Sequence, residues 1–291
     1  MIAQQLVNGL FLGAVYALFA IGYTLVFGVL DILNLAHAAI FMIAAFATWS
    51  LLAILPLPVA FVLGVILAGI LGVLLDKIAF APLRKRNAGT LIPLISSIGM
   101  AIIIGAIATG IYGVDERHFT LGLIDAPPFH VGSIAFSAVE LTILGLSLAL
   151  MVILTYVMRQ TALGRNIRAV AEDKIAAQLL GVNLERTIAG TFFIASALGG
   201  AAGILTGLQY NSVTVGMGGQ IELKGLAVII LGGMGSITGA VIGGFIIGAV
   251  ETLSVAYGLS AWRDAIAFGV MFLILIVRPT GIFGKRALRA A

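Results

Sequence analysis

The chain has 291 residues, of which 61% are hydrophobic and 10% are charged, and its net charge is +4. Soluble globular chains are roughly 45–50% apolar and about 25% charged, so this composition excludes a water-soluble fold. The lack of cysteine excludes disulfide frameworks and thiolate metal sites, and membrane proteins collect Lys and Arg in cytoplasmic loops, so the charge does not indicate nucleic-acid binding.

Eight apolar runs follow one another along the chain, and a membrane-spanning helix needs about 20 such residues. The runs lie at about 6–29, 35–54, 57–79, 91–113, 139–158, 190–209, 223–254 and 264–277. They are too long and too rich in Gly and Ala for the strands of a membrane barrel. The opening segment lacks the basic region and cleavage site of a secretory signal, so we expect the first run to stay as a span. The prediction is an all-α, polytopic transmembrane bundle that forms one domain over 1–291.

Three groups of basic residues set the predicted topology. They lie at 77–86, 159–186 and 278–289, and the positive-inside tendency places all three in the cytoplasm. The loop at about 114–138, which is more acidic than basic, is expected outside. Three runs separate the second group from the third, and this odd number would put the C-terminus on the wrong side. A broken or re-entrant helix pair around 223–244, entering and leaving from the outer side, would restore a cytoplasmic C-terminus.

Two of the apolar runs are interrupted, one in each half of the chain. In the second half the interruption consists of the glycines Gly232, Gly233, Gly235 and Gly239. In the first half the segment GVLDILNLAHAAIF (28–41) carries polar residues. We therefore predict discontinuous helices in each half and a distant internal repeat, as in many transporters whose broken helices line the pathway. Gly232, Gly233 and Gly235 are candidate pathway residues.

The polar residues of the first interruption are Asp31, Asn34 and His37. At helical spacing they fall within an arc of roughly 120° on one helix face. They are therefore interpreted either as the lining of a polar pathway or as a structural clamp that bonds to a neighbouring helix. A proton relay through His37 and Asp31 is the weaker alternative, because no further acid continues the series.

Two further groups of polar residues lie near the ends of apolar runs. Gln209 and Asn211 end the sixth run on the outer side, where they could meet a polar solute or serve as ordinary loop residues. Glu251 lies late in the broken segment, and Asp264 follows Arg263 at the start of the last run. We interpret these acids as interfacial or paired, and not as catalytic groups.

The loop at about 159–189 predicts a cytoplasmic coupling element. Its middle favours one amphipathic helix over about 166–180, ended by Gly181, with Asn183 capping the next helix. The apolar positions of this helix are Ile167, Val170, Ala171, Ile175 and Leu179. Such a face must pack on lipid headgroups, on the protein's own inner surface or on a partner, and the mixed charge of the segment favours a partner.

Motifs of enzymes and nucleotide-binding proteins are missing from the sequence. It contains no GxxxxGK, no HExxH and no GxSxG, and His37, His118 and His130 are too scattered for a metal cluster. An intramembrane enzyme is therefore poorly supported. A secondary transporter or channel would share the spans but should show an ion-coupling acid or a selectivity ring. If this protein moves a solute uphill, the energy must come from elsewhere.

Five segments together resemble one known family over almost the whole chain. They are NGLFLGAVYALFAIGYTLVFGVLDILNLAHAAIF, FAPLRKR (80–86), GRNIRAVAEDKIAAQLLGVN, LKGLAVIILGGMGSITGAVIGG and SAWRDAIAFGVMFLILIVRPTGIFG (260–284). Their order and spacing resemble the LivH-type permease subunits of branched-chain amino acid ABC importers. One departure is Ala38, where the family usually has Gly, which questions a close backbone contact there.

The resemblance implies a multi-subunit importer in the plasma (inner) membrane of a bacterium or archaeon. This chain would pair with a second related permease, two cytoplasmic ATPases that bind ATP and Mg, and an extracytoplasmic solute-binding protein. It would itself bind membrane lipid but no cofactor and no nucleic acid, and it would not be an enzyme. By the same resemblance the ATPase contact would be formed by Arg168, Ala169, Glu172, Asp173 and Gly181.

The resemblance also limits the substrate. It implies branched-chain or other neutral amino acids, while related permeases carry urea or short amides. Substrate choice in such importers lies largely with the binding protein, so this chain leaves the solute open. The sequence likewise leaves open whether the two permeases are identical.

Overall fold

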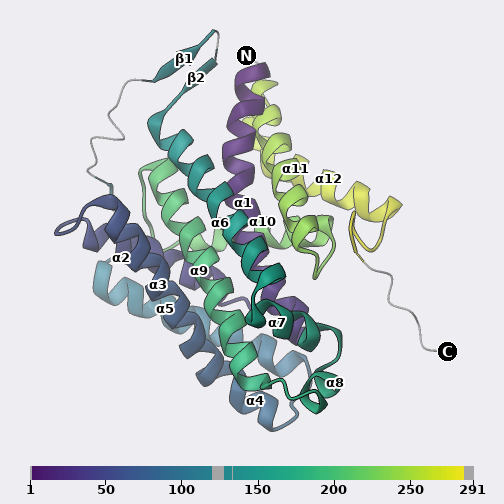
Figure 1. The fold of residues 1–291 in the computed structure, drawn as a ribbon. Helices are drawn as coiled ribbons and strands as arrows, with labels where there is room; N and C mark the ends of the chain where they lie inside the picture. The colour runs from purple at the N-terminus through teal and green to yellow at the C-terminus, as the bar shows by residue number, and fades with distance from the viewer. Residues whose placement is uncertain (1, 120–127, 133, 285–291) are drawn as a thin grey trace.

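The computed structural model describes residues 2–119, 128–132 and 134–284, and it is a helical bundle with one short hairpin (Figure 1). The first half contains α1 (Ile2–Leu30), α2 (His37–Leu51), α3 (Leu57–Leu75), α4 (Ala81–Lys85) and α5 (Leu91–Tyr112). A π-helical turn at Asp76–Phe80 joins α3 to α4. The strands β1 (Phe129–Val131) and β2 (Ile134–Phe136) then form an antiparallel pair.

The second half is also helical. It contains α6 (Ala138–Gln160), α7 (Ala162–Glu172), α8 (Lys174–Leu179), α9 (Leu184–Tyr210), α10 (Met217–Gly232), α11 (Ile237–Ala256) and α12 (Arg263–Val277). A short 3-10 turn at Ser260–Trp262 precedes α12. Local capping explains several of these boundaries: Ser137 forms a capping box with Glu140 at the start of α6, and Asn183 caps α9, as predicted.

Seven helical segments in the described part of the chain are long and apolar enough to cross a membrane. They are α1, α3 with α4, α5, α6, α9, α11, and α12 with its preceding turn. The helices α2 and α10 are shorter, and the run predicted at 223–254 is divided between α10 and α11. The predicted polytopic bundle is therefore confirmed, and its eight runs correspond to nine helices within the described residues.

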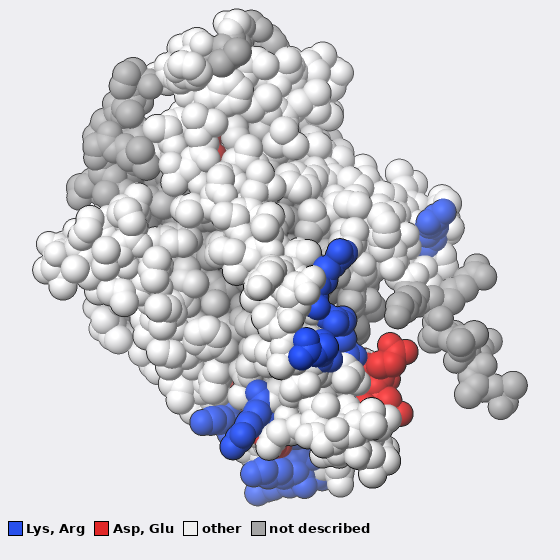
Figure 2. All heavy atoms as spheres, viewed as in Figure 1, with Lys and Arg blue, Asp and Glu red and all other residues white. Residues whose placement is uncertain are grey.

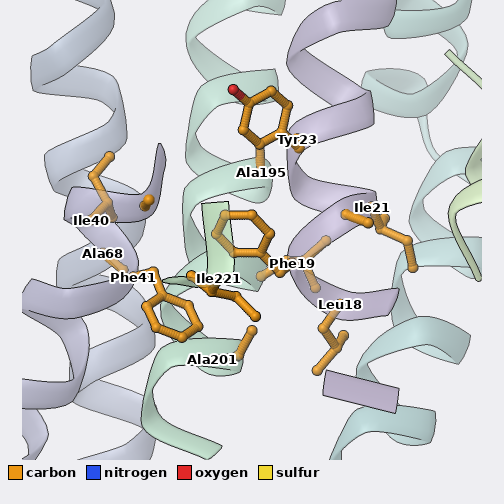
Figure 3. Close-up of a cluster of buried hydrophobic side chains, with 14 of the residues drawn as sticks. Leu18, Phe19, Ile21, Tyr23, Ile40, Phe41, Ala68, Ala195, Ala201 and Ile221 are labelled. Atoms are coloured by element: carbon orange, nitrogen blue, oxygen red, sulfur yellow. The ribbon is translucent and has the colours of Figure 1, made fainter. Parts of the chain in front are cut away.

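The long helices α1 and α9 form the centre of the bundle, and both are mostly buried. Small residues allow this close approach: a Cβ added to Gly203 of α9 would collide with the backbone of Phe41 in α2, and one added to Gly200 would collide with Ala68 in α3. Figure 3 shows side chains of α1, α2, α3, α9 and α10 meeting in this core, among them Phe19 of α1. Close packing replaces the hydrophobic driving force that lipid cannot supply between helices.

The outer helices expose apolar side chains, which is the reverse of a soluble protein. On α5, Ile95 and Ile102 are each 66% exposed, and on α12 Phe272 and Leu273 are similarly exposed. These surfaces must be covered by lipid or by another membrane subunit, because an apolar surface of this extent is unstable in water.

The two ends of the bundle differ in charge. We call the end with the start of α1, the hairpin and the end of α9 the hairpin end, where the side chain of Gln4 bonds to the backbone of Ala135. The opposite end carries α4, α7 and α8, and Figure 2 shows Lys and Arg gathered there, so we call it the basic end. The basic groups predicted at 77–86 and 159–186 thus share one end. Most of the third group, from residue 285, lies outside the described residues, as do residues 120–127 and 133 of the predicted outer loop.

The chain contains an inverted structural repeat, in which α1–α2–α3 corresponds to α9–α10–α11. Helix α1 packs antiparallel to α11, with Gly13 against Phe245, and α9 packs antiparallel to α3, with Gly200 against Ala68. Helix α10 runs beside α1, and α2 runs beside α9. The two long helices run in opposite directions, so the repeats have opposite orientations, as in many transporters. The predicted internal repeat is therefore present.

Of the two equivalent breaks, however, only the one in the first half is a predicted one. The connection after α1 corresponds to the connection after α9, because each begins with a non-glycine residue of positive φ, Asp31 at 59° and Asn211 at 48°. The same interval along the chain separates Leu30 from Tyr210 and His37 from Met217. The glycine-rich break at 233–236 is instead the turn between α10 and α11. The prediction paired the first break with the glycine-rich segment because a group of glycines is a clear sequence signal, whereas a single Asn such as Asn211 is not.

Candidate functional site

A cavity of about 380 Å³ lies between α1, α9 and α10 toward the hairpin end, and we call it the hairpin-side cavity. Its lining residues are Leu12, Val15, Tyr16, Thr206, Gln209, Tyr210, Ser212, Thr214, Met217, Gln220, Ile221, Lys224 and Arg263. Pockets for small ligands are typically about 300–1,000 Å³ in volume. The cavity is therefore large enough for a small solute.

A group of charged side chains borders this cavity at membrane depth. Lys224 Nζ lies 2.9 Å from Glu251 Oε2, 3.0 Å from the hydroxyl of Tyr16 and 3.2 Å from Asp264 Oδ1. The hydroxyl of Tyr16 donates to the same oxygen of Glu251 at 3.0 Å. Arg263 Nε lies 3.5 Å from Asp264 Oδ1. Four elements, α1, α10, α11 and α12, therefore meet in one ionic network.

The tertiary packing brings these groups together. Helix α10 approaches α1 closely at Gly225, where a Cβ would collide with the ring of Phe19. This approach places the preceding residue, Lys224, against Tyr16, and the hairpin α10–α11 brings Glu251 beside it. Ionisable residues inside membrane segments are costly and usually pair with one another, lining a substrate pathway. Glu251 and Asp264 are therefore each paired with a cation, as predicted.

Lys224 and Tyr16 are the residues that sequence reasoning missed. Lys224 lies inside an apolar segment, and a lone cation in such a segment is a signal that could have been used. Tyr16 carried no comparable signal, because a tyrosine in an apolar helix is ordinary. Its importance follows only from its position opposite Lys224.

A second cavity, of about 400 Å³, lies at the basic end and is called the basic-side cavity. It is lined by Thr24, Leu25, Gly28, Val29, Leu154, Thr155, Met158, Arg159, Ile167, Arg168, Ala171, Glu172, Gly235, Ile237 and Thr238. The two cavities touch different stretches of α1, and the buried residues Phe19 to Tyr23 lie between these stretches.

The prediction that Asp31, Asn34 and His37 share one helix face is wrong. Residues 31–36 are not helical, because the backbone of Asp31 turns into the left-handed region and ends α1. The carboxylate of Asp31 is exposed and lies 3.4 Å from Lys174 Nζ in α8. It is therefore a surface group at the basic end, away from the other two.

Asn34 and His37 are both buried. The side-chain oxygen of Asn34 accepts a hydrogen bond from the backbone N–H of Ala36 at 3.2 Å, which holds the connection into α2. The ring of His37 packs against Phe19 at 4.8 Å and against Tyr23 at 5.5 Å between centroids. Asn34 is thus a polar clamp within the helix break itself, and its hydrogen bond is not to a neighbouring helix. His37 lines neither of the two cavities.

Gln209 and Asn211, which were predicted together, have different surroundings. Gln209 lines the hairpin-side cavity, and its side-chain oxygen is buried without a hydrogen-bond partner among the described residues. Asn211 ends α9 in the left-handed conformation, and its side chain accepts from the backbone N–H of Phe119 at 2.8 Å. Asn211 therefore holds the connection, and Gln209 remains the candidate pathway residue.

The predicted glycines form the turn between α10 and α11. Gly232 packs against Gly239 so closely that a Cβ on either would collide with the other's backbone. Gly233 and Gly235 both have positive φ, at 100° and 84°, which side chains strongly disfavour. Gly235 also lines the basic-side cavity, whereas Gly233 lies against Gly284.

Ala38 stands where the family that the chain resembles usually has Gly, yet the backbones of α2 and α10 still approach closely at this position. A Cβ added to Gly218 of α10 would collide with the carbonyl oxygen of Ala38 in α2. The small residue that permits this approach is therefore on α10.

The predicted helix over 166–180 is divided into two, which corrects the expectation. Asp173 interrupts it and caps α8, accepting from the backbone N–H groups of Ile175 and Ala176 at 2.8 and 3.0 Å. Ile167 and Val170 of α7 pack into the bundle, but Ile175 and Leu179 of α8 are exposed. The apolar residues thus face two directions, because Asp173 redirects the chain between them.

Other predicted coupling residues lie at the exposed surface of the same end. Arg168 and Glu172 border the basic-side cavity, and Ala169 is half-buried on α7. Gly181, with φ of 85°, follows α8 as the expected terminator. In the described part of the chain no cluster of His, Asp or Glu is arranged to hold a metal ion.

Comparison with known proteins identifies the family. The model described as "Branched-chain amino acid transport system / permease component" matches residues 5–275. The high-affinity branched-chain amino acid transport permease BraD of Pseudomonas aeruginosa is 36% identical, with 97% of this chain and 95% of the relative covered. LivH of Escherichia coli K12 is 35% identical over the same shares, and the probable LivH of Methanocaldococcus jannaschii is 30% identical over 92% and 88%. No solved structure matches the chain. The resemblance is confirmed, and the chain belongs to the permease components of branched-chain amino acid transport systems.

Proposed function

We propose that this chain is the permease subunit of an ATP-driven importer of branched-chain amino acids. It assembles with a second related permease, two cytoplasmic ATPases that hold ATP and Mg, and an extracytoplasmic solute-binding protein. Family membership supports the transport role. The observation that supports the ATPase contact is the exposure of three apolar side chains at the basic end, with Ile175 at 72% and Leu179 and Leu180 at 84% each.

These side chains form a docking knob, by which we mean Ile175, Leu179 and Leu180 of the α8 region. They belong to the basic end, where Figure 2 shows Lys and Arg gathered, and an apolar groove of a partner would cover them better than charged lipid headgroups. Helices that dock into a partner's groove present such apolar anchors. The basic end is accordingly the cytoplasmic side by the positive-inside tendency, and Arg278 follows α12 toward a cytoplasmic C-terminus.

Helix α7 provides the mechanical link from the docking knob to the bundle. Its buried side, at Ile167 and Val170, is part of the core, and its Arg168 and Glu172 border the basic-side cavity. A movement of the ATPases at α8 therefore reaches this cavity through one short, well-packed helix. We propose that this movement opens and closes the cytoplasmic exit, as the inverted repeat suggests for alternating access.

The test measures ATP-dependent uptake of radiolabelled L-leucine by the complete complex in proteoliposomes. Leu179→Asp with Leu180→Asp places charges in an apolar contact, and we expect ATPase association to weaken at least about a hundredfold, since interface anchors contribute about 2 kcal/mol or more each. Glu172→Arg should abolish uptake while the permease still inserts in the membrane. Glu116→Arg, the same exchange at an exposed residue far from the basic end, is the matched control and should transport normally.

Normal uptake by both test variants would disprove the coupling role of this region. Leucine uptake by the permease without ATPases would instead favour a secondary transporter or channel. Uptake of urea or short amides in place of leucine would leave the coupling intact and correct the substrate.

A further inference from the structure

The lining of the hairpin-side cavity combines two kinds of side chain. Its aliphatic members include Leu12, Val15, Met217 and Ile221. Its polar and charged members are Tyr16, Thr206, Gln209, Tyr210, Ser212, Thr214, Gln220, Lys224 and Arg263. A ligand that uses both kinds of contact has an apolar part and a charged part within a small volume.

The cations of the ionic network line the cavity, while their acidic partners lie behind them. Lys224 and Arg263 are lining residues, but Glu251 and Asp264 are not. The side chain of Glu251 is almost fully buried and holds Lys224 together with Tyr16. The charged groups of the network that a solute in the cavity meets are therefore the two cations, and these are suited to a carboxylate.

One carboxylate can already bind both cations. Oδ1 of Asp264 lies 3.2 Å from Lys224 Nζ and 3.5 Å from Arg263 Nε. Asp264 is half exposed, in contrast to Glu251, so it is the partner that another carboxylate can replace. Glu251 remains in place because it is buried and accepts bonds from two neighbours.

We propose that the hairpin-side cavity is a transit binding site for an aliphatic amino acid, a proposal that rests on the proposed transport function. The α-carboxylate of the solute displaces Asp264 from Lys224 and Arg263. The buried side-chain oxygen of Gln209 accepts a hydrogen bond from the α-ammonium group. The aliphatic side chain lies against Leu12, Val15 and Ile221.

A charge-balanced double variant separates solute binding from structural support. In Lys224→Met with Glu251→Gln, no unpaired charge is left in the bundle, so the fold is spared the cost of breaking a buried pair. We expect leucine uptake by the complete complex to fall at least about tenfold, because truncating a desolvated charge contact costs about 2 kcal/mol or more. Complex assembly and ATP hydrolysis stimulated by the binding protein should persist. Lys77→Met, which removes an exposed cation outside α7 and α8, is the matched control with unchanged uptake.

The Asp264→Asn variant tests the displacement directly. With a weaker competitor on Lys224 and Arg263, the half-saturation concentration for leucine should fall and not rise. A rise would show that Asp264 supports binding, and would overturn the displacement step.

A labelling measurement covers the case in which the double variant fails to assemble. Because the chain has no native cysteine, Gln220→Cys places a single thiol in the cavity. Millimolar L-leucine should slow modification of this thiol by a methanethiosulfonate reagent, and 3-methylbutan-1-amine, which lacks the carboxylate, should not. Equal protection by both compounds, or by neither, would overturn the site.

The outcomes distinguish this site from the proposed function. A wild-type complex without ATP-dependent leucine uptake contradicts the importer itself. A transporting wild type together with normal uptake by the charge-balanced double variant contradicts only the binding site, because Lys224 then has a structural role alone.

Discussion

Two lysine–carboxylate pairs in this protein have similar geometry but very different surroundings. Lys224 and Glu251 lie 2.9 Å apart with side chains only 12% and 2% exposed. Lys174 and Asp31 lie 3.4 Å apart with side chains 41% and 74% exposed. An exposed pair contributes about 0–1 kcal/mol, whereas removing one partner of a buried pair costs about 3–5 kcal/mol. The burial of each pair, more than its N–O distance, therefore determines how much the pair matters for stability.

The difference also separates two functions of charge. The exposed pair joins α8 to the end of α1, where water and salt weaken it, so it holds α8 only loosely. The buried pair joins α10 to α11 inside the bundle, and its cation still lines a cavity. Under the proposed function, the first region would transmit movement and the second would recognise the solute.

The largest effect should come from breaking the buried pair. Glu251→Ala leaves Lys224 and Tyr16 without their common acceptor, and we expect the permease to lose about 3–5 kcal/mol of stability. Thermal unfolding in detergent, followed by size-exclusion chromatography, measures the loss. The charge-balanced Lys224→Met with Glu251→Gln should be clearly more stable than Glu251→Ala. Equal stability of the two would show that an unpaired charge is not the cause.

A smaller effect should follow from moving the buried pair without changing its chemistry. Gly225→Leu introduces a side chain where even a Cβ collides with Phe19, so α10 must separate from α1 and carry Lys224 away from Tyr16. Overpacking of this kind costs about 1–3 kcal/mol. Gly219→Leu, on the same helix with open space at its Cβ, is the control, and the same thermal assay compares them. A destabilisation of equal size in both would indicate a helix-wide cause.

The smallest effect should come from the exposed pair. Lys174→Met and Asp31→Asn should each change stability by less than about 1 kcal/mol, and less still at high salt. Leucine uptake should remain near the wild-type rate. A loss comparable to that of Glu251→Ala would mean that the end of α1 and α8 form a rigid unit, and the comparison between the two pairs would fail.

Much of the architecture follows from local sequence. Apolar runs of membrane length, the acid-poor and cysteine-free composition, and the grouping of Lys and Arg at one end predict the helical bundle. Asn183 as a cap and Gly181 as a terminator are correct, because these residues act on the backbone within one turn. The family follows from ordered motifs along the whole chain.

The errors arose where a local pattern was extended through a residue that ends a helix. Asp31 and Asp173 each occupy helical spacing with their neighbours, yet Asp31 turns left-handed and Asp173 caps the next helix. Asp and Asn make such turns because their short polar side chains bond to nearby backbone groups. Periodicity alone does not distinguish these residues from ordinary polar positions on a helix.

The sequence by itself determined which segments enter the membrane and which end carries the charges, since both depend on the composition of short stretches. Only the tertiary structure decided which polar residues meet. Tyr16, Lys224 and Glu251 come from three helices, and their contact exists because small residues such as Gly225 let the helix backbones approach. Buried charges must find partners across the bundle, and the identity of those partners depends on helix packing that no single segment encodes.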